Sequence, residues 1–193
     1  MTRDSWHVSR VIFIDRDGVI NVDRGGYVTR PEDFRFEKGV VSAMKELCDQ
    51  GYGIVIISNQ AGIGDGVFAY EQLEAVQQHM LGVLKQNGVP VLGSYYCLHG
   101  KQASCGCRKP KTGLFKQAAA DFYFEPAETF FIGDKAGDIE AGKKFGLKTI
   151  LVRTGYGRAH EKKLTGDLTP DHTADTLKHA VAWLVARSKQ LLS

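Results

Sequence analysis

The sequence predicts an α/β protein with a doubly wound, Rossmann-like parallel sheet, and three observations predict it. Short apolar segments of strand length alternate along the chain with longer segments of helical periodicity, the pattern that βαβ units leave in a sequence. The apolar segments are nearly continuous, as expected for strands covered on both faces. Polar residues follow directly after several of them, at positions that would share one edge of a parallel sheet.

Each element follows from its local composition. The predicted strands, in chain order, are Val11 to Asp15, Gly53 to Ser58, Gly93 to Leu98, Thr129 to Gly133 and Lys148 to Val152. The predicted helices are Val40 to Gln50, Tyr70 to Gln86, Gly113 to Asp121, Gly137 to Phe145 and Thr176 to Leu192. Gly51 and Gly88 follow the first two helices, and Pro126 prevents extension of the third.

Three segments fall outside this alternation. The segments from Arg16 to Lys38 and from Gly100 to Thr112 are long connections after the first and third strands. The polar segment from Thr154 to Asp175 contains three glycines and Pro170, so we interpret it as a surface loop before a final packing helix. No repeat or linker interrupts the chain, and residues 1–193 are predicted to form a single domain.

Composition narrows the class of protein. The chain has 193 residues, 43% of them hydrophobic and 24% charged, which is typical of a globular protein with a full core. The net charge of +3 suits a site for small anions, but dense Lys/Arg runs are missing, so nucleic acid is not an expected partner. We expect a cytoplasmic protein with no membrane association, because neither an apolar leader nor a membrane-length apolar segment is present. We expect a monomer, because no long apolar surface stripe is evident.

Two aspartates one residue apart follow the first predicted strand. Asp15 and Asp17 are followed at once by Gly18, so two carboxylates and a bend lie just beyond the sheet edge. This arrangement suits a metal ion and a phosphate, but Asp and Gly are also the ordinary residues of a turn that leaves a strand. The motif alone leaves both interpretations open.

Polar residues at two other strand ends favour the phosphate site. Ser58, Asn59 and Gln60 end the second strand, and Asp134 and Lys135 end the fourth. Together with Asp15 and Asp17, and with Asp138 four residues after Asp134, these residues resemble the motifs of the haloacid dehalogenase superfamily of phosphohydrolases over nearly the whole chain. The resemblance implies the haloacid dehalogenase fold, here without a large cap domain because the insertions are short.

The resemblance also implies roles for these side chains. Asp15 is the implied nucleophile, which forms an aspartyl-phosphate, and Asp17 is the implied acid and base, for which its pKa must be raised. A catalytic Mg²⁺ is implied between Asp15, Asp134 and the main-chain carbonyl of Asp17, with Asp138 as support. Ser58 would donate a hydrogen bond to a transferring oxygen.

A lysine must supply a fixed positive charge, and two segments offer one. The basic segment Arg108 to Lys111 is by composition a solvated loop, but it precedes a predicted helix whose first turn suits an anion. The resemblance favours Lys109 as the residue that stabilises the phosphoryl group and Arg108 as a substrate-binding residue. Lys135 is expected to neutralise the site as well, with a salt bridge to Asp134 as the alternative.

Four potential soft ligands lie within eleven residues. Cys97, His99, Cys105 and Cys107 have a spacing that suits a tetrahedral Zn²⁺ with no open coordination position, so the zinc would be structural. Free thiols or a redox pair are the alternatives. The zinc-bound loop would lead directly into Arg108 and Lys109 and position them. Cys48, in an amphipathic helix, is expected to be an inert core thiol.

The zinc loop narrows the resemblance to one branch, that of the heptose bisphosphate phosphatases and the histidinol phosphatases. The segments Val19 to Asp23, Gly26 to Val28 and Glu32 to Phe34 resemble the substrate loop of the heptose enzymes. The implied reaction is hydrolysis of the 7-phosphate of D-glycero-D-manno-heptose 1,7-bisphosphate, whose product would serve lipopolysaccharide core or surface-glycan synthesis. The implied substrate-binding residues are Asp23, Arg24, Gly25, Gly26, Asn59, Gln60, Arg108 and Lys135.

Two departures from that pattern concern the substrate side. The segment Arg24 to Gly26 has one extra residue, which would shift contacts there. Asp65 stands where many heptose enzymes are expected to have a basic residue, so it either alters the grip on the second phosphate or lies in a solvent-facing turn.

Other functions compete with the heptose assignment. A histidinol-phosphate phosphatase is the nearest alternative. A DNA 3′-phosphatase is disfavoured by the modest charge, and a non-catalytic phosphosugar-binding relative is disfavoured by the intact set of Asp15, Asp17, Lys109 and Asp134.

Overall fold

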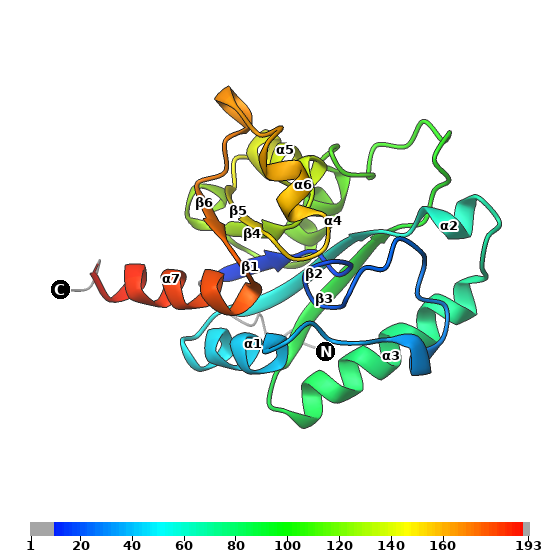
Figure 1. Ribbon diagram of the computed structural model, residues 1–193, viewed down its shortest axis with the longest axis horizontal. Coiled ribbons are helices and arrows are strands. Elements are labelled where there is room, and N and C mark those ends of the chain that lie inside the picture. Colours follow the sequence, from blue (N-terminus) through cyan, green and yellow to red (C-terminus); the bar gives the residue numbers. More distant parts are fainter. Residues whose placement is uncertain (1–9, 191–193) are drawn as a thin grey trace.

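Six parallel strands form one sheet in the order β3-β2-β1-β4-β5-β6 in the computed structural model, which describes residues 10–190 (Figure 1). The strands are β1 (Val11–Ile14), β2 (Gly53–Asn59), β3 (Val91–Cys97), β4 (Phe130–Gly133), β5 (Lys148–Val152) and β6 (His172–Ala174). This is the strand order of the Rossmann fold, with β1 and β4 adjacent where the order reverses. The predicted fold class is therefore confirmed.

Helices cover both faces of the sheet. They are α1 (Val40–Asp49), α2 (Ala61–Gly64), α3 (Tyr70–Gln86), α4 (Gly113–Asp121), α5 (Ala136–Phe145), α6 (Gly157–Glu161) and α7 (Leu177–Gln190), with short 3₁₀ turns η1 (Pro31–Asp33), η2 (Pro126–Glu128) and η3 (Gly166–Leu168). Buried side chains of α1, α3 and α7 pack on one face, and those of α4 and α5 pack on the other. Figure 1 shows α1 and α7 on the side of the sheet opposite α4 and α5.

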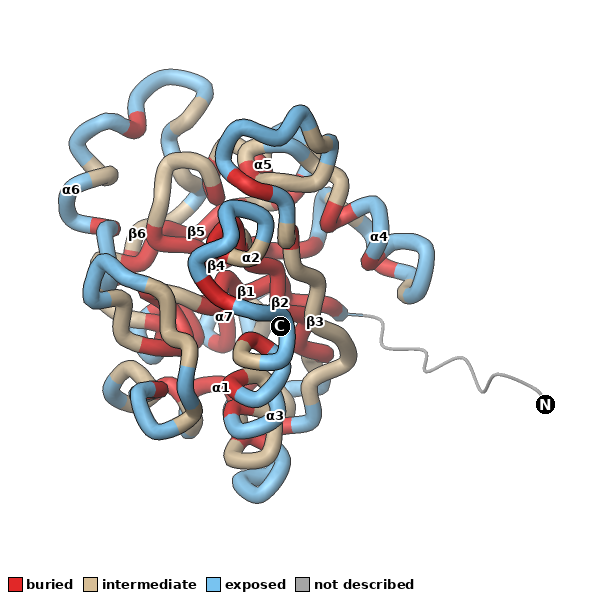
Figure 2. The backbone as a smooth tube through the Cα atoms, turned by 90° about the vertical axis from the view of Figure 1, so that its right-hand side faces the viewer, coloured by how far each residue is buried: buried red, intermediate tan, exposed pale blue. Residues whose placement is uncertain are grey.

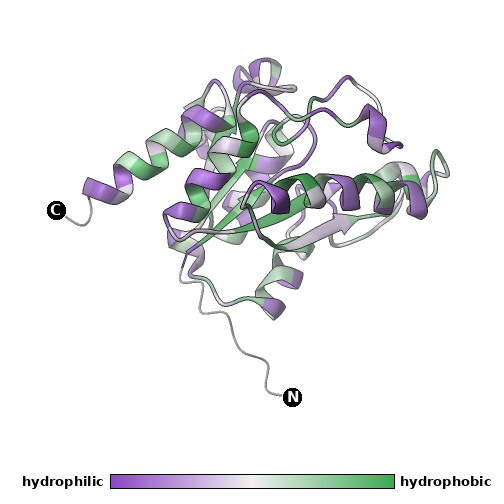
Figure 3. Cartoon of the chain, turned by 90° about the horizontal axis from the view of Figure 1, so that it is seen from below, coloured by the Kyte–Doolittle hydropathy of each residue, from purple (hydrophilic) through white to green (hydrophobic). Residues whose placement is uncertain are grey.

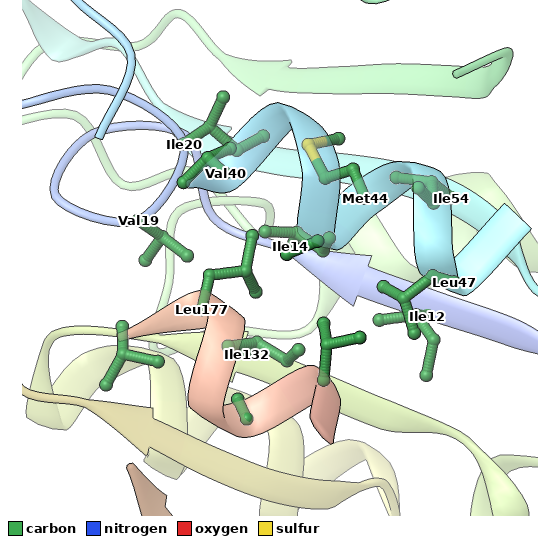
Figure 4. Packing of buried hydrophobic residues seen from close by; sticks show 14 of the residues in the cluster. Ile12, Ile14, Val19, Ile20, Val40, Met44, Leu47, Ile54, Ile132 and Leu177 are labelled. Atoms are coloured by element: carbon green, nitrogen blue, oxygen red, sulfur yellow. The ribbon is translucent and has the colours of Figure 1, made fainter. Parts of the chain in front are cut away.

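The alternation of side chains along β1 divides the core in two. Ile12 and Ile14 join the cluster under α1, α3 and α7, whereas Val11 and Phe13 join the cluster under α4. Figure 4 shows Ile12 and Ile14 beside Leu47 of α1 and Leu177 of α7. The strands β1, β2, β4 and β5 are therefore nearly continuous apolar segments because both of their faces are buried, and Figure 2 shows buried segments in red at the centre of the molecule.

The helices carry the opposite pattern, since only one stripe of each is covered. Val76, Met80 and Leu84 of α3 are buried at helical spacing, while most of the positions between them are exposed or half-buried. Figure 3 accordingly shows hydrophilic and hydrophobic residues on the same helical ribbons.

The segment from Thr154 to Asp175 was predicted wrongly as loop throughout. It contains α6, η3 and β6, and β6 pairs with β5 through Ile150 and His172. A three-residue edge strand that begins with histidine and threonine is too short and too polar to give a periodic signal. The sheet pairing, not the local sequence, makes this segment a strand.

Other boundaries shift by one or two residues. The predicted strand Gly93 to Leu98 begins at Val91 in β3, and the short helix α2 was not predicted. The last two positions of the predicted helix Thr176 to Leu192, and the first nine residues of the chain, lie outside the described residues. Within residues 10–190 no helix combines the length and apolarity that crossing a bilayer needs.

Candidate active site

Asp15 directly follows β1 at the carboxyl end of the sheet. Its main-chain N–H donates to the carbonyl of Ile132 in β4, 2.9 Å away, so the ladder between the two central strands fixes its position. Gly18 has a φ of 87° and closes the turn that follows. A Cβ atom at Gly18 would lie 2.3 Å from Oδ2 of Asp134, so only glycine lets the two strand ends approach this closely.

A buried lysine links the end of β1 to α5 and β2. The ammonium group of Lys109 lies 2.9 Å from Oδ1 of Asp15, 2.7 Å from Oδ1 of Asp138 and 3.1 Å from the carbonyl of Ile57, to which it donates. Burial alone would lower the pKa of Lys109, but the two carboxylates outweigh it and hold the pKa above the ordinary value. Lys109 is therefore a charged group with three partners for three protons.

The main chain of Lys109 is fixed by the end of β2. Nδ2 of Asn59 donates to the carbonyl of Lys109, and the N–H of Lys109 donates to Oδ1 of Asn59, both at 3.1 Å. The basic segment therefore crosses the carboxyl end of β2 and is not a solvated loop at this residue, whose exposed fraction is 6%.

Asp134 is fully buried and only partly satisfied. Oδ2 accepts a hydrogen bond of 2.8 Å from the main-chain N–H of Tyr156, while Oδ1 accepts none. Burial, and then the charges of Asp138 and Asp15, raise the pKa of Asp134 to about 8. Burial likewise raises the pKa of Asp15 to about 6, against the opposing charge of Lys109.

These carboxylates suit a divalent cation. Asp15, Asp134 and Asp138 each bring an oxygen within 4.8 Å of the others. Both oxygens of Asp138 already have partners, since Oδ1 contacts Lys109 and Oδ2 accepts the main-chain N–H of Lys135 at 3.0 Å. Oδ1 of Asp134, which lies near Asp15, has no hydrogen-bond donor. A hard cation such as Mg²⁺ could coordinate this oxygen and neutralise its charge.

Asp17 has the opposite electrostatic environment from Asp15. Its carboxylate accepts two hydrogen bonds from Nη2 of Arg16, at 2.8 and 2.9 Å, one of 3.1 Å from Nδ2 of Asn21 and one of 2.7 Å from Nε2 of Gln60. Burial raises its pKa, but Arg16 and the two amides outweigh burial, and the pKa of Asp17 lies below its ordinary value. The expectation of a raised pKa was wrong, because Arg16, which lies between the two aspartates, donates to the carboxylate of Asp17 and stabilises its ionised form.

Ser58 and Gln60 form a buried link to Asp17. Nε2 of Gln60 donates to Oγ of Ser58 at 3.0 Å as well as to Asp17. Ser58 and Gln60 are at most 1% exposed. Gln60 therefore supports the carboxylate of Asp17 from behind, and it is not among the residues that line the cavity in front of it.

A cavity of about 380 Å³ opens in front of Asp17. Its lining consists of Asp17, Asp23, Gly25, Gly26, Tyr27, Asn59, Lys101, Lys135 and Tyr156. Lys135 crosses this cavity and forms an ion pair of 3.0 Å with Asp23, and its ammonium group lies 4.9 Å from the ring centroid of Tyr156. Its distance to Asp134 is 3.9 Å, so Asp23 is the nearer partner.

Two predicted substrate-binding arginines lie elsewhere. Arg24 lines a neighbouring cavity of about 290 Å³ that adjoins the first through Gly26 and Tyr27. Nη1 of Arg108 donates to the carbonyl of His99 at 3.3 Å. Both residues lie in the connection between β3 and α4, residues 98–112, which we call the cysteine loop. Neither arginine side chain lines the larger cavity.

The four predicted zinc ligands converge. Sγ of Cys107 lies 3.3 Å from Sγ of Cys97 and 3.2 Å from Nδ1 of His99, and Sγ of Cys97 lies 3.7 Å from Sγ of Cys105. Such separations are close to the edges of a zinc tetrahedron. Burial raises the pKa of Cys105, but main-chain N–H groups and its neighbours outweigh this and lower it to about 6, which favours a thiolate. The cluster therefore fits Zn²⁺. Cys48 is half-buried outside it, and burial raises the pKa of its thiol.

Asp65 does not face the cavity. Its Oδ1 accepts a hydrogen bond of 2.8 Å from the main-chain N–H of Lys101, so the acid after α2 holds the cysteine loop. A Cβ atom at Gly64 would lie 2.1 Å from the main-chain nitrogen of Gly100, which shows how closely the two segments pack. Asp65 is exposed in the turn that follows α2, so the alternative of a solvent-facing turn is confirmed, and the hydrogen bond to Lys101 is a contact that the sequence did not indicate.

Sequence reasoning gave no role of their own to five residues of the site. Arg16 and Asn21 hold Asp17, and Tyr27, Tyr156 and Lys101 line the cavity. The position of Arg16 inside the Asp-x-Asp motif was a usable signal. Tyr156 and Lys101 had none, because their place depends on how distant loops pack.

The chain is similar to known hydrolases. A family model described as HAD-hydrolase-like matches residues 106–180. The D-glycero-beta-D-manno-heptose-1,7-bisphosphate 7-phosphatase of Haemophilus ducreyi is 39% identical over 178 residues, which cover 88% of this chain and 97% of that protein. The protein of the same name from Escherichia coli O6:H1 is 38% identical over 85% of this chain and 90% of its own length.

A solved structure extends this similarity to the fold. The D,D-heptose 1,7-bisphosphate phosphatase from B. bronchiseptica, complexed with magnesium and phosphate, is 29% identical, has a TM-score of 0.87, and matches over 92% of this chain and 99% of its own.

Proposed function

The chain belongs to the family of the D-glycero-beta-D-manno-heptose-1,7-bisphosphate 7-phosphatases, which are phosphoric monoester hydrolases of the haloacid dehalogenase type, and on this premise we propose that it hydrolyses the 7-phosphate of that bisphosphate. The product would be the heptose 1-phosphate. The observation that carries the proposal is the buried group of Asp15, Lys109 and Asp134 beside a polar cavity.

Asp15 is the proposed nucleophile. Lys109 and the main-chain N–H of Arg16 hold its Oδ1, and its Oδ2 has no hydrogen-bond donor in residues 10–190, so Oδ2 is the oxygen open to attack. Attack on phosphorus would form an aspartyl-phosphate and release the sugar oxygen. Lys109 would supply positive charge to the transferring oxygens, and Ser58 would donate a hydrogen bond to one of them.

Asp17 is the proposed acid and base. It would donate a proton to the leaving oxygen and later take one from the water that hydrolyses the aspartyl-phosphate. Because Arg16, Asn21 and Gln60 favour its ionised form, proton donation requires the carboxylate to leave these partners as the sugar phosphate enters.

Mg²⁺ is the proposed catalytic cation, held by Asp15, Asp134 and the main-chain carbonyl of Asp17, and Zn²⁺ the proposed structural one. Bound there, Mg²⁺ would neutralise charge on the phosphoryl oxygens. The other residues proposed to bind the sugar are Asp23, Gly25, Gly26, Asn59 and Lys135, all of which line the cavity.

A substrate comparison tests this function. Phosphate release with Mg²⁺ would be measured for both anomers of heptose 1,7-bisphosphate, for histidinol phosphate and for a 3′-phosphorylated oligonucleotide. We expect the bisphosphate to give the highest kcat/KM, and Asp15→Asn to lose at least about 10³-fold in kcat. A higher kcat/KM for histidinol phosphate or for the oligonucleotide would refute the proposed function and identify the preferred substrate class. Equal rates for the wild type and Asp15→Asn would refute Asp15 as nucleophile.

A further inference from the structure

Lys101 is a lysine of the cavity lining that has no role in the proposed reaction. It lies two residues after His99 in the cysteine loop and lines the cavity together with Lys135 and Tyr156. Its side chain is exposed, and its ammonium group forms no ion pair or hydrogen bond with any of residues 10–190. A lysine that reaches a substrate cavity without a partner is available to a ligand.

The other charges that line the cavity are neutralised in pairs. Asp17 is paired with Arg16 at 2.8 Å, and Asp23 is paired with Lys135 at 3.0 Å. Lys101 is the remaining charged side chain of the lining, so among the described residues the cavity carries one positive charge without a counter-charge. An anionic group of the ligand would balance it.

The backbone that carries Lys101 is fixed although its side chain is not. Asp65 accepts the main-chain N–H of Lys101, and the close contact between Gly64 and Gly100 leaves no room for the loop to shift toward α2. Arg108 holds the neighbouring carbonyl of His99. These contacts keep the Cα atom of Lys101 at the cavity and leave its ammonium group free to meet a ligand.

Resting on the proposed function, we infer that Lys101 binds the second phosphate of the substrate, the one that is not hydrolysed, and that Asp65 is its positioning residue. The reacting phosphate would lie against Asp15 and Lys109, and the rest of the sugar would extend into the cavity past Asp17. The distal phosphate then meets the only unpaired cation among the described lining residues. A lysine suits this position as a point charge on a flexible stem.

Two substrates that differ only in the distal phosphate test the inference. The steady-state constants of Lys101→Ala would be measured with heptose 1,7-bisphosphate and with heptose 7-phosphate. For the bisphosphate we expect KM to rise about tenfold or more with kcat changed by less than about twofold. For the 7-phosphate we expect kcat/KM to stay unchanged, and Lys101→Arg should retain most of the affinity for the bisphosphate.

Matched variants separate positioning from charge. Asp65→Ala should raise KM for the bisphosphate but not for the 7-phosphate. Asp65→Asn keeps an oxygen acceptor for the N–H of Lys101 and should leave both KM values unchanged. Lys116→Ala, at an exposed lysine of α4 outside the cavity, is the control for loss of one positive charge. Zinc content would be measured in every variant to exclude a collapsed loop.

The outcomes distinguish the inference from the function beneath it. If the wild type does not hydrolyse the bisphosphate, both the proposed function and the inference are refuted. The inference alone is refuted if the wild type hydrolyses the bisphosphate and Lys101→Ala keeps the same kcat/KM, or loses the same factor in kcat/KM with both substrates.

Discussion

Asp15 and Asp17 are separated by one residue, but their pKa values are shifted in opposite directions. The pKa of Asp15 is raised to about 6, chiefly by burial, and that of Asp17 is lowered because Arg16, Asn21 and Gln60 outweigh its burial. The two residues acquire opposite shifts because they have different partners: Lys109 contacts Asp15, whereas Arg16, Asn21 and Gln60 donate to Asp17. The motif thus provides two carboxylates whose different surroundings support the different roles proposed for them, nucleophile for Asp15 and proton carrier for Asp17.

His160 gives a pH prediction at the residue scale. Its Nδ1 accepts the main-chain N–H of Ala136 at 3.1 Å, next to Lys135, so the ring must be neutral there. Burial, and then Lys163 and Lys135, lower the pKa of His160. We expect its ring protons to titrate below the ordinary value of about 6.5 in an NMR titration. The stability that this contact contributes is therefore present above pH 6.5 and lost as the pH falls through the lowered pKa.

The ring-proton signals of His160 would be assigned by their absence from the spectrum of His160→Gln. His172, also with a pKa lowered by burial but far from Ala136 in the sequence, serves as a second reference. A titration of His160 at or above 6.5 would contradict a neutral acceptor at the first turn of α5.

At the scale of elements, the cysteine loop is the connection on which the site depends most. It joins β3 to α4, contacts α2 through Gly64 and Asp65, and continues into Lys109, whose main chain is held by Asn59. One loop therefore carries both Lys109, the buried lysine proposed to act in the reaction, and Lys101, the exposed lysine of the cavity. Disordering it would affect catalysis and binding together.

Cys107→Ser tests the loop. We expect zinc stoichiometry to fall, because a hydroxyl is a poor ligand for Zn²⁺, and kcat/KM for the bisphosphate to fall with it because Lys101 and Lys109 lose their support. Zinc would be measured by elemental analysis of the purified protein. Cys48→Ser, at a half-buried thiol outside the cluster, should keep its zinc. Unchanged zinc in Cys107→Ser would refute the ligand set.

At the scale of the molecule, the doubly wound sheet concentrates negative charge inside the protein. β1, β4 and α5 bring Asp15, Asp134 and Asp138 together, and the raised pKa of Asp134 reflects the cost of that arrangement. Lys109 offsets part of it. A divalent cation bound by Asp15 and Asp134 would offset the rest, so the site and the stability of the fold are coupled.

Thermal unfolding with and without Mg²⁺ measures this coupling. At a Mg²⁺ concentration of about 100 times Kd, binding to the folded state alone should raise the melting temperature by about 5 to 10 °C. At neutral pH, Asp134→Asn should be more stable than the wild type without Mg²⁺, because the raised pKa of Asp134 makes burial of this carboxyl group unfavourable above its unfolded-state pKa. The variant should also respond little to Mg²⁺. An equal response of both proteins would show that Mg²⁺ acts at another site.

The fold was predictable from the sequence because burial on both faces leaves a signal in every central strand. β1, β2, β4 and β5 are short apolar segments, and their register brings the polar residues that follow them to one edge. β6 left no such signal, since an edge strand of three residues needs only one neighbour and few apolar side chains. A predicted helix end was accurate where a glycine follows, as at Gly88, since α3 ends at Gln86 as predicted.

The sequence by itself determined the chemistry available to this protein: the carboxylates at the ends of β1 and β4, the lysine beside them, and four soft ligands in one loop. Only the tertiary structure decided how these groups act on one another. Arg16 lowers the pKa of Asp17, Asp65 holds a loop, and Lys101 reaches the cavity without a partner. The reason is physical: residue types and strand ends follow from local patterns of burial, whereas pKa values and free charges depend on contacts between segments that are distant in the chain.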